Sequence, residues 1–186
     1  MNDRDKKLIV AAHAVFSRYG ISKTTMNDIA REAGVARQTL YNAYPNKEAI
    51  LRTAVRVSAE ETYVNVDAAW RDLTELSEKI EVFFQFGPLC WYDMVVASPE
   101  MGDLIDGIHC IAKDEMEEFA VLWKGRFEDL IKEHAKPGSA AYDDAAATAD
   151  FLYSCGINAK LDAADRSVVQ SRLAILKRSI LALVAE

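Results

Sequence analysis

The stretch that decides the fold is "GVARQTLYNAYPNKEAIL", residues 34–51. It opens with a glycine, places arginine, amide and tyrosine side chains around Leu40, and is interrupted by Pro45. A proline lacks a backbone donor and clashes with the preceding helical turn, so a helix over 37–44 must stop there. Asn46 is a favourable N-cap for a new helix directly afterwards. The stretch therefore predicts a short helix with a polar surface, followed by a second helix.

The segment before it, "TTMNDIAREAG" (24–34), predicts another short helix. Thr24 or Thr25 can cap its start, and Gly34 can end it because glycine tolerates the positive φ of a tight turn. Ala30 is small where the two helices must cross closely. The residues expected to form the small core between them are Ile29, Val35 and Leu40. Two short helices joined by such a turn are typical of a helix-turn-helix unit.

The rest of the chain also has helical periodicity, which predicts an all-α fold. A first helix over about 4–20 has an apolar face and ends at Gly20, and a long fourth helix runs from Asn46 to about Trp70. That apolar face consists of Leu8, Ala11, Ala12, Val15, Phe16 and Tyr19. Pro88 should kink or break a later helix, and the last two helices are expected at about 141–160 and 165–184.

Charge divides the 186 residues unevenly. Residues 1–60 contain ten Lys and Arg against six Asp and Glu, a balance of +4, whereas the remainder contains 12 against 23, a balance of −11. The net charge of −7 therefore hides a basic first third that suits a polyanionic partner. No apolar run is long enough to cross a bilayer and the start "MNDRDKKLIV" lacks a signal-peptide pattern, so we expect a cytoplasmic protein. Cys90, Cys110 and Cys155 are expected to be free thiols.

The second helix of the helix-turn-helix unit has few inward residues, which leaves its polar side chains free to contact DNA. Arg37, Gln38 and Asn42 are the candidates for reading bases, because arginine and amide groups form bidentate hydrogen bonds with guanine and adenine edges. The candidates for phosphate contacts are Thr25, Thr39, Tyr41, Tyr44 and Lys47. Tyr41 can equally contact a thymine methyl group.

Residues 16–51 resemble the DNA-binding domain of the TetR family of transcriptional regulators. The resemblance rests on "FSRYGISKTT", "IAREAGV", "TLY" and "YPNKEAIL", and it extends to about residues 1–70. Gln38, Asn42 and Ala43 depart from residues frequent in the family, and these changes concern which operator is read. The resemblance implies a helix-turn-helix domain (1–46), a linking fourth helix (47–70), and a C-terminal helical domain (71–186) for effector binding and dimerisation.

The resemblance also implies a homodimer in which the last two helices of each chain form a four-helix interface. A palindromic operator requires the same two-fold symmetry. Small residues on the first of these helices allow close approach, and the second supplies apolar area. The expected interface residues are Ala145, Ala149, Leu152, Gly156, Leu173, Leu176 and Ile180.

The middle of the chain is rich in aromatic and sulfur side chains, which fits an apolar effector pocket with a few polar groups. The pocket candidates are Trp70, Phe86, Cys90, Trp91, Met94, His109, Trp123 and Phe127. Each of them can instead be an ordinary core residue. Neighbours such as His109 and Cys110 diverge by about 100° on a helix and cannot easily share a metal, so no metal or cofactor is expected.

These features favour a ligand-responsive transcriptional regulator, most simply a repressor that a small hydrophobic or aromatic effector releases from operator DNA. Two alternatives stay open at this point. One is a DNA-binding regulator without a small-molecule effector, acting as an activator or controlled by a protein partner. The other is a helical enzyme, although no local pattern places an activating histidine and carboxylate beside a nucleophile. The operator sequence, the effector and the regulated genes are not encoded in any of these patterns.

Overall fold

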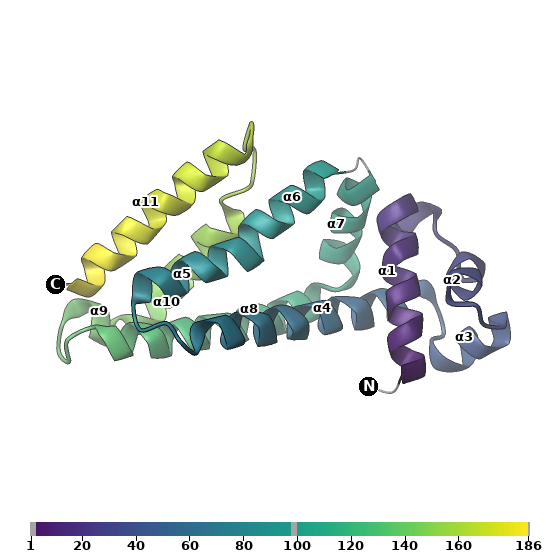
Figure 1. Ribbon diagram of the computed structural model, residues 1–186, viewed down its shortest axis with the longest axis horizontal. Coiled ribbons are helices and arrows are strands. Elements are labelled where there is room, and N and C mark those ends of the chain that lie inside the picture. Colours follow the sequence, from purple (N-terminus) through teal and green to yellow (C-terminus); the bar gives the residue numbers. More distant parts are fainter. Residues whose placement is uncertain (1–2, 98–99, 186) are drawn as a thin grey trace. The chain divides into compact units, whose positions relative to one another are not determined.

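The computed structural model describes residues 3–97 and 100–185, and within these ranges all regular structure is helical. The elements are α1 (Asp3–Lys23), α2 (Met26–Ala33), α3 (Arg37–Ala43), α4 (Lys47–Trp70), α5 (Leu76–Phe84), a π-helical turn η1 (Gln85–Leu89), α6 (Cys90–Ala97), α7 (Glu100–Ile111), α8 (Lys113–His134), α9 (Ala140–Asp143), α10 (Ala145–Asn158) and α11 (Arg166–Ala185) (Figure 1). The all-α prediction is confirmed. No helix in the described ranges is both long and apolar enough to cross a membrane.

The chain forms two compact units whose boundaries differ from the expected domains. The N-terminal unit contains Met1–Glu61 and Met94–Glu117, and the C-terminal unit contains Thr62–Asp93 and Glu118–Glu186. The chain therefore passes from one unit to the other within α4, α6 and α8. The expected division placed all of 71–186 in one domain, because nothing in the sequence around α7 reveals that it packs against α1.

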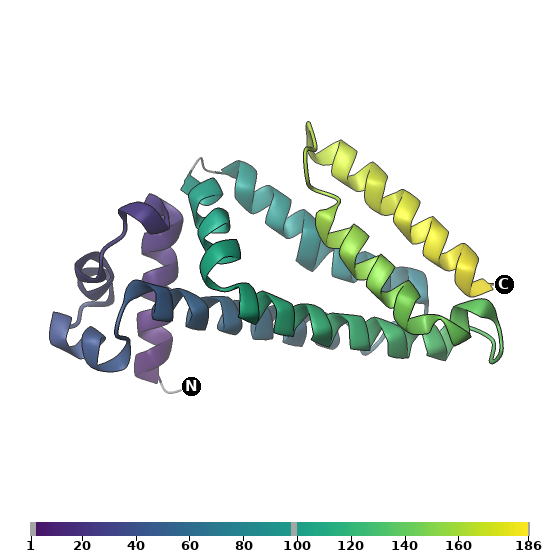
Figure 2. The ribbon, with the colours of Figure 1, turned by 180° about the vertical axis from the view of Figure 1, so that it is seen from behind.

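In the N-terminal unit, α1 lies between α7 and the α2–α3 pair (Figures 1 and 2). Leu8, Ala12 and Phe16 of its apolar face are buried, whereas Tyr19 is exposed with the Arg18 guanidinium over its ring. This corrects the expectation for Tyr19. The helical conformation is interrupted at the next residue, Gly20, which has φ 74°. The helix therefore breaks where the sequence predicted, although one further turn follows the break.

The break in α1 is also where α7 is attached. The Asp103 carboxylate accepts hydrogen bonds from the Ser22 amide (3.0 Å) and the Ser22 hydroxyl (2.6 Å). These bonds favour the ionised carboxylate and lower the pKa of Asp103. Gly107 faces Ile21 so closely that a side chain there would collide with it. A polar clamp and an apolar contact together hold α7 on the end of α1.

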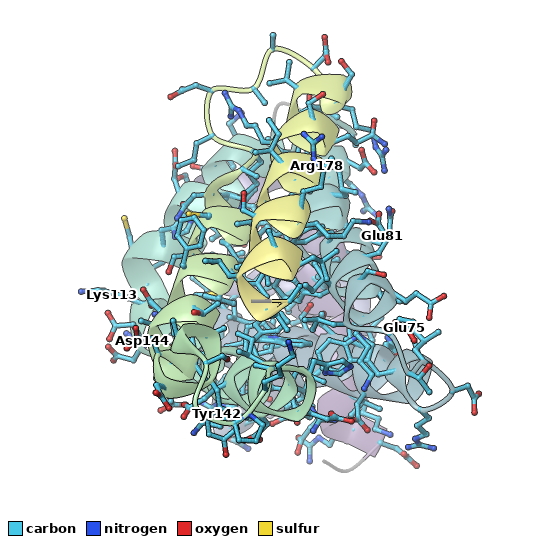
Figure 3. All side chains as sticks on the ribbon, turned by 90° about the vertical axis from the view of Figure 1, so that its left-hand side faces the viewer. Glu75, Glu81, Lys113, Tyr142, Asp144 and Arg178 are labelled. Atoms are coloured by element: carbon cyan, nitrogen blue, oxygen red, sulfur yellow. The ribbon has the colours of Figure 1, made fainter. Side chains whose placement is uncertain are left out.

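In the C-terminal unit, α10 and α11 lie side by side, and α11 also packs on α5 (Figures 1 and 2). The end view in Figure 3 shows side chains filling the space between the helices. Lys177 of α11 pairs with Glu81 of α5, while the neighbouring Arg178 is exposed. Pro88 lies within the π-helical turn η1, which absorbs the missing backbone donor between α5 and α6. The expected distortion at Pro88 is therefore confirmed.

Candidate nucleic-acid interface and aromatic cluster

Local hydrogen bonds fix both ends of α2. Thr25 is the N-cap and forms a capping box with Asp28, in which each side chain accepts a hydrogen bond from the other residue's backbone N–H. Gly34 ends the helix in the left-handed conformation with φ 63°, and the Val35 amide donates to the Ala30 carbonyl at 3.0 Å. Thr24 is buried instead, and its hydroxyl donates to the Gly20 carbonyl. The turn leading to α3 is therefore fixed by local contacts.

Leu40 is the buried residue of α3, and it anchors the helix on the unit while the polar positions stay exposed. Two side-chain pairs order that exposed surface. Arg37 donates to the Tyr41 hydroxyl at 3.3 Å with its guanidinium over the tyrosine ring, and Gln38 donates to the Asn42 amide oxygen at 2.9 Å. Both pairs have the i,i+4 spacing that places side chains on one helix face. α3 therefore presents partly ordered donors and acceptors.

The predicted phosphate residues differ in their surroundings. The Thr25 hydroxyl donates to the Asp28 carboxylate at 2.6 Å, and Thr39 is half-buried. Tyr44 is also half-buried, and its burial raises the pKa of its phenol. Lys47 donates to the Ile21 carbonyl at 2.7 Å and the Thr24 carbonyl at 3.1 Å. Its positive charge therefore lies against backbone carbonyl groups at the C-terminal end of α1. Two of the three ammonium donors of Lys47 are thus used within the unit.

Two basic residues that sequence reasoning missed lie beside the helix-turn-helix unit. Arg4 donates to the Thr39 carbonyl of α3 at 3.4 Å. The Lys7 ammonium lies near Gly34, in the turn between α2 and α3, and would be 3.9 Å from the Cβ of any larger residue at that position. Arg4 and Lys7 are three residues apart and share a face of α1. The spacing of Arg4 and Lys7 predicts that they share a helix face, but nothing in the sequence shows that this face meets α3.

The interior of the C-terminal unit contains a group of packed rings from α4, α5 and α8, here called the aromatic cluster. Its members are Tyr63, Trp70, Phe83, Phe119, Trp123 and Phe127. Trp123 is its centre, because its ring lies 4.9–5.9 Å from the five others. The indole N–H of Trp70 donates to the Lys79 carbonyl at 2.9 Å, whereas the buried indole N–H of Trp123 has no hydrogen-bond partner.

The structure brings together only three of the predicted pocket residues, namely Trp70, Trp123 and Phe127. Phe86 and Cys90 are exposed, and the half-buried Trp91 has the Lys160 ammonium 5.9 Å from its ring centre. Met94 and the exposed His109 belong to the N-terminal unit. The richness of this segment in aromatic and sulfur side chains did not reveal which unit each helix segment joins. Among the described residues, no group of His, Cys, Asp and Glu is arranged to hold a metal ion.

The expected dimer-interface residues are buried inside their own chain, which corrects that prediction. These residues are Ala145, Ala149, Leu152, Gly156, Leu173, Leu176 and Ile180. They pack α10 and α11 against each other and against α5, so their surface is already covered. Large apolar side chains on the opposite faces are exposed instead, with Phe151 46% and Ile175 56% accessible. The apolar stripe in the sequence marked the internal face of each helix.

A capped helix, a left-handed glycine turn and a short helix with an exposed polar face define a DNA-binding protein of the helix-turn-helix class. Residues 8–54 match the family model described as bacterial regulatory proteins, tetR family. Residues 8–54 therefore have the DNA-binding domain of the TetR family of transcriptional regulators. The resemblance seen in residues 16–51 is thus confirmed.

Solved structures share the fold of the whole chain at low sequence identity. The fatty acid degradation regulator FadR from Bacillus halodurans has a TM-score of 0.70 and 16% identity, over 99% of this chain and 96% of that one. A TetR-family transcriptional regulator from Pectobacterium atrosepticum has a TM-score of 0.69 and 18% identity, over 98% and 94%. FadR from Bacillus subtilis, solved in complex with stearoyl-CoA, has a TM-score of 0.62 and 16% identity, over 96% and 97%. No curated protein sequence matches the chain.

Proposed function

We propose that this TetR-family regulator is a cytoplasmic repressor that binds a palindromic operator as a homodimer and is released by a small, largely apolar effector. The observation that carries the proposal is the surface of α3, where Leu40 is buried and Arg37, Gln38, Tyr41 and Asn42 are exposed. An exposed helix with ordered arginine and amide side chains suits the major groove of DNA.

The two pairs on α3 suggest separate roles in recognition. Gln38 and Asn42 present linked amides that are suited to adenine, and Arg37 presents a guanidinium suited to guanine. Tyr41 positions Arg37 through a hydrogen bond and through the cation–π contact of its ring. Tyr44 and Lys47 are less available for phosphate contacts than the sequence suggested, because both are partly engaged within the unit.

The exposed apolar side chains of α10 and α11 support a homodimer through these two helices. Phe151 lies on α10, and Ile175 and Leu183 lie on α11. Because Leu176 is buried in its own chain, Ile175→Asp is the sharper test of the dimer. We expect Ile175→Asp to give folded monomers in sedimentation velocity, whereas Leu176→Asp should unfold the C-terminal unit. A dimer unaffected by Ile175→Asp would place the interface elsewhere.

Effector control is supported by the aromatic interior of the C-terminal unit and by the ligand of a structural neighbour. FadR from Bacillus subtilis was solved with stearoyl-CoA, so this fold can hold a partly apolar small molecule. We propose that an effector favours a dimer geometry in which the two recognition helices no longer match successive major grooves, about 34–36 Å apart. Helix α4, which continues from one unit into the other, carries the change. Linkage then requires the operator and the effector to weaken each other's binding by the same factor.

Selection of binding sites from a random duplex DNA pool at about 0.15 M salt tests the DNA-binding part of the proposal. Wild-type protein should enrich a palindrome, and an Arg37→Ala, Tyr41→Ala double variant should not. Arg71→Ala is the matched control, because it removes an exposed arginine that lies outside α3 and outside the two helices proposed for the dimer, and it should leave the enrichment unchanged. Equal enrichment by the double variant would exclude α3 as the reading helix.

The selected operator then serves as the probe for an effector screen. A compound that lowers operator affinity, and whose own affinity falls by the same factor in the presence of operator, supports the repressor mechanism. Operator binding that no compound alters would favour the alternative of a regulator without a small-molecule effector.

A further inference from the structure

The aromatic cluster contains two buried tryptophans whose indole groups differ in one respect. The Trp70 N–H donates to the Lys79 carbonyl at 2.9 Å. The Trp123 side chain is only 1% exposed, and its N–H has no hydrogen-bond partner. The surrounding rings can act only as weak acceptors. A buried donor without an acceptor is costly and rare in proteins, so this one requires an explanation.

A second unpartnered donor lies one helical turn further along α8. The buried Nε of Arg126 also lacks a partner, although the same guanidinium donates to Asp67 at 2.9 Å through another nitrogen. Residues three apart on a helix are neighbours on its surface. Both residues also contact Trp70. The ring centres of Trp123 and Trp70 are 5.8 Å apart, and the Arg126 guanidinium lies 5.6 Å from the centre of the Trp70 ring. The unused donors thus belong to one region of the C-terminal unit.

We propose that the indole N–H of Trp123 is the hydrogen-bond donor of an effector site in the aromatic cluster, and that the ligand is a compact aromatic molecule carrying a carbonyl-type oxygen. This inference rests on the proposed effector function and specifies the chemistry of its ligand. The oxygen supplies the acceptor that Trp123 lacks.

The packing of the rings sets the shape of the ligand. Ring centres within the aromatic cluster are separated by 4.8–6.1 Å, which is the usual range for contacting aromatic pairs. A planar aromatic ligand offers these side chains further ring contacts of the same kind. A saturated chain offers none. The site therefore favours a flat, ring-containing ligand over an extended acyl chain.

A pair of probes isolates the hydrogen bond. Acetophenone has a carbonyl oxygen beside its ring, and ethylbenzene has a similar shape without an acceptor. Because a partnered donor typically contributes about 1 kcal/mol, wild-type protein should bind acetophenone about fivefold more tightly than ethylbenzene in isothermal titration calorimetry. Trp123→Phe keeps an aromatic ring but removes the N–H, so this preference should disappear while ethylbenzene affinity is unchanged.

Trp91→Phe is the matched control, because it makes the same change at a half-buried tryptophan outside the aromatic cluster. It should retain the preference for acetophenone. A Trp123→Phe protein that keeps the preference would overturn the proposal, as would a wild-type protein that shows none.

Nuclear magnetic resonance of the indole groups gives a readout that does not depend on a stable Trp123 variant. The chain has three tryptophans, so Trp70→Phe and Trp91→Phe assign the Trp123 indole resonance by elimination. Acetophenone should move that resonance downfield, as expected for a new hydrogen bond, and ethylbenzene should not. A downfield shift confined to either of the other tryptophans would contradict the proposed site.

Binding and DNA release are measured separately, so the two claims can fail independently. A Trp123-dependent preference for acetophenone supports the site whether or not operator DNA is released, because release tests the proposed function. A compound that releases the operator equally from wild-type and Trp123→Phe protein supports the proposed function and contradicts the site.

Discussion

The helix-turn-helix segment and the aromatic cluster are built in opposite ways. The first is contiguous in the sequence, fixed by the Thr25 cap and the Gly34 turn, and it presents its polar groups on the surface. The second is assembled from α4, α5 and α8, and it holds polar groups inside an apolar interior. The difference teaches that a surface made by local hydrogen bonds can be predicted from a short stretch of sequence. An interior made by helices that are distant in the sequence cannot be predicted in this way.

The largest expected effect is on the free energy of unfolding, and it compares the loss of a ring inside the aromatic cluster with the loss of one outside it. Phe127→Ala should lower the free energy of unfolding of the C-terminal unit by about 4 kcal/mol, because it leaves a cavity among packed rings. Phe86, which is 42% exposed, offers the control, and Phe86→Ala should cost less than about 1 kcal/mol. Urea unfolding followed by near-ultraviolet circular dichroism measures both. Similar losses for the two variants would show that the cluster is not the core of this unit.

The next effect concerns a glycine in each unit. Gly20→Ala should destabilise the N-terminal unit by about 1–3 kcal/mol, because φ is positive there and the new methyl group would collide with the Asp103 carboxylate. Gly125 of α8 has open space around it, so Gly125→Ala should be neutral or stabilising by up to about 1 kcal/mol. Thermal unfolding curves compare the two variants. Equal melting temperatures would rule out the clamp between α1 and α7.

A smaller effect tests whether the DNA-facing surface extends beyond the contiguous segment. The Arg4→Ala, Lys7→Ala double variant should bind operator and unrelated DNA more weakly by the same factor. Its slope of log affinity against log salt should be smaller in magnitude by about two, as for two lost phosphate contacts. Lys6→Ala is the control, since residue 6 is about 100° away from Lys7 around α1. A slope that changes equally in both variants would indicate a general charge effect.

The smallest effect is a titration inside the C-terminal unit. Burial raises the pKa of Tyr153 to about 12, because the phenolate is poorly solvated there. The neutral phenol therefore contributes stability fully below the unfolded pKa of about 10, and that contribution is lost as the pH rises toward 12. Phenolate absorbance should show one tyrosine that ionises late, and Tyr153→Phe should remove that step. If Tyr153 ionised near pH 10 in the folded protein, this part of the interior would be solvated.

The local features were predictable because neighbouring residues determine them. The ends of α2, the break at Gly20 and the start of α4 directly after Asn46 follow from capping and from glycine or proline chemistry. Whether Thr24 or Thr25 forms the cap needed the structure, since both have the required hydroxyl. The polar surface of α3 was also predicted, because Leu40, its one large aliphatic residue, had to face inward.

The features that depend on tertiary packing were not predictable from one sequence. The stripe containing Leu173, Leu176 and Ile180 has the periodicity of any buried helix face, and periodicity does not say which chain covers it. His109 and Met94 were grouped with the aromatic pocket candidates, but their segments join the N-terminal unit. The unpaired N–H of Trp123 is visible only once the surrounding rings are placed.

The clamp between Ser22 and Asp103 bears on how new regulators arise by exchange of gene segments. A recombination that transfers only residues 1–61 would carry Ser22 and Ile21 away from Asp103 and Gly107. Residues 94–117 therefore form a second, discontinuous part of the unit that contains the helix-turn-helix segment. Chimaeras designed to redirect this protein to a foreign operator should exchange both segments together, or restrict the exchange to α3.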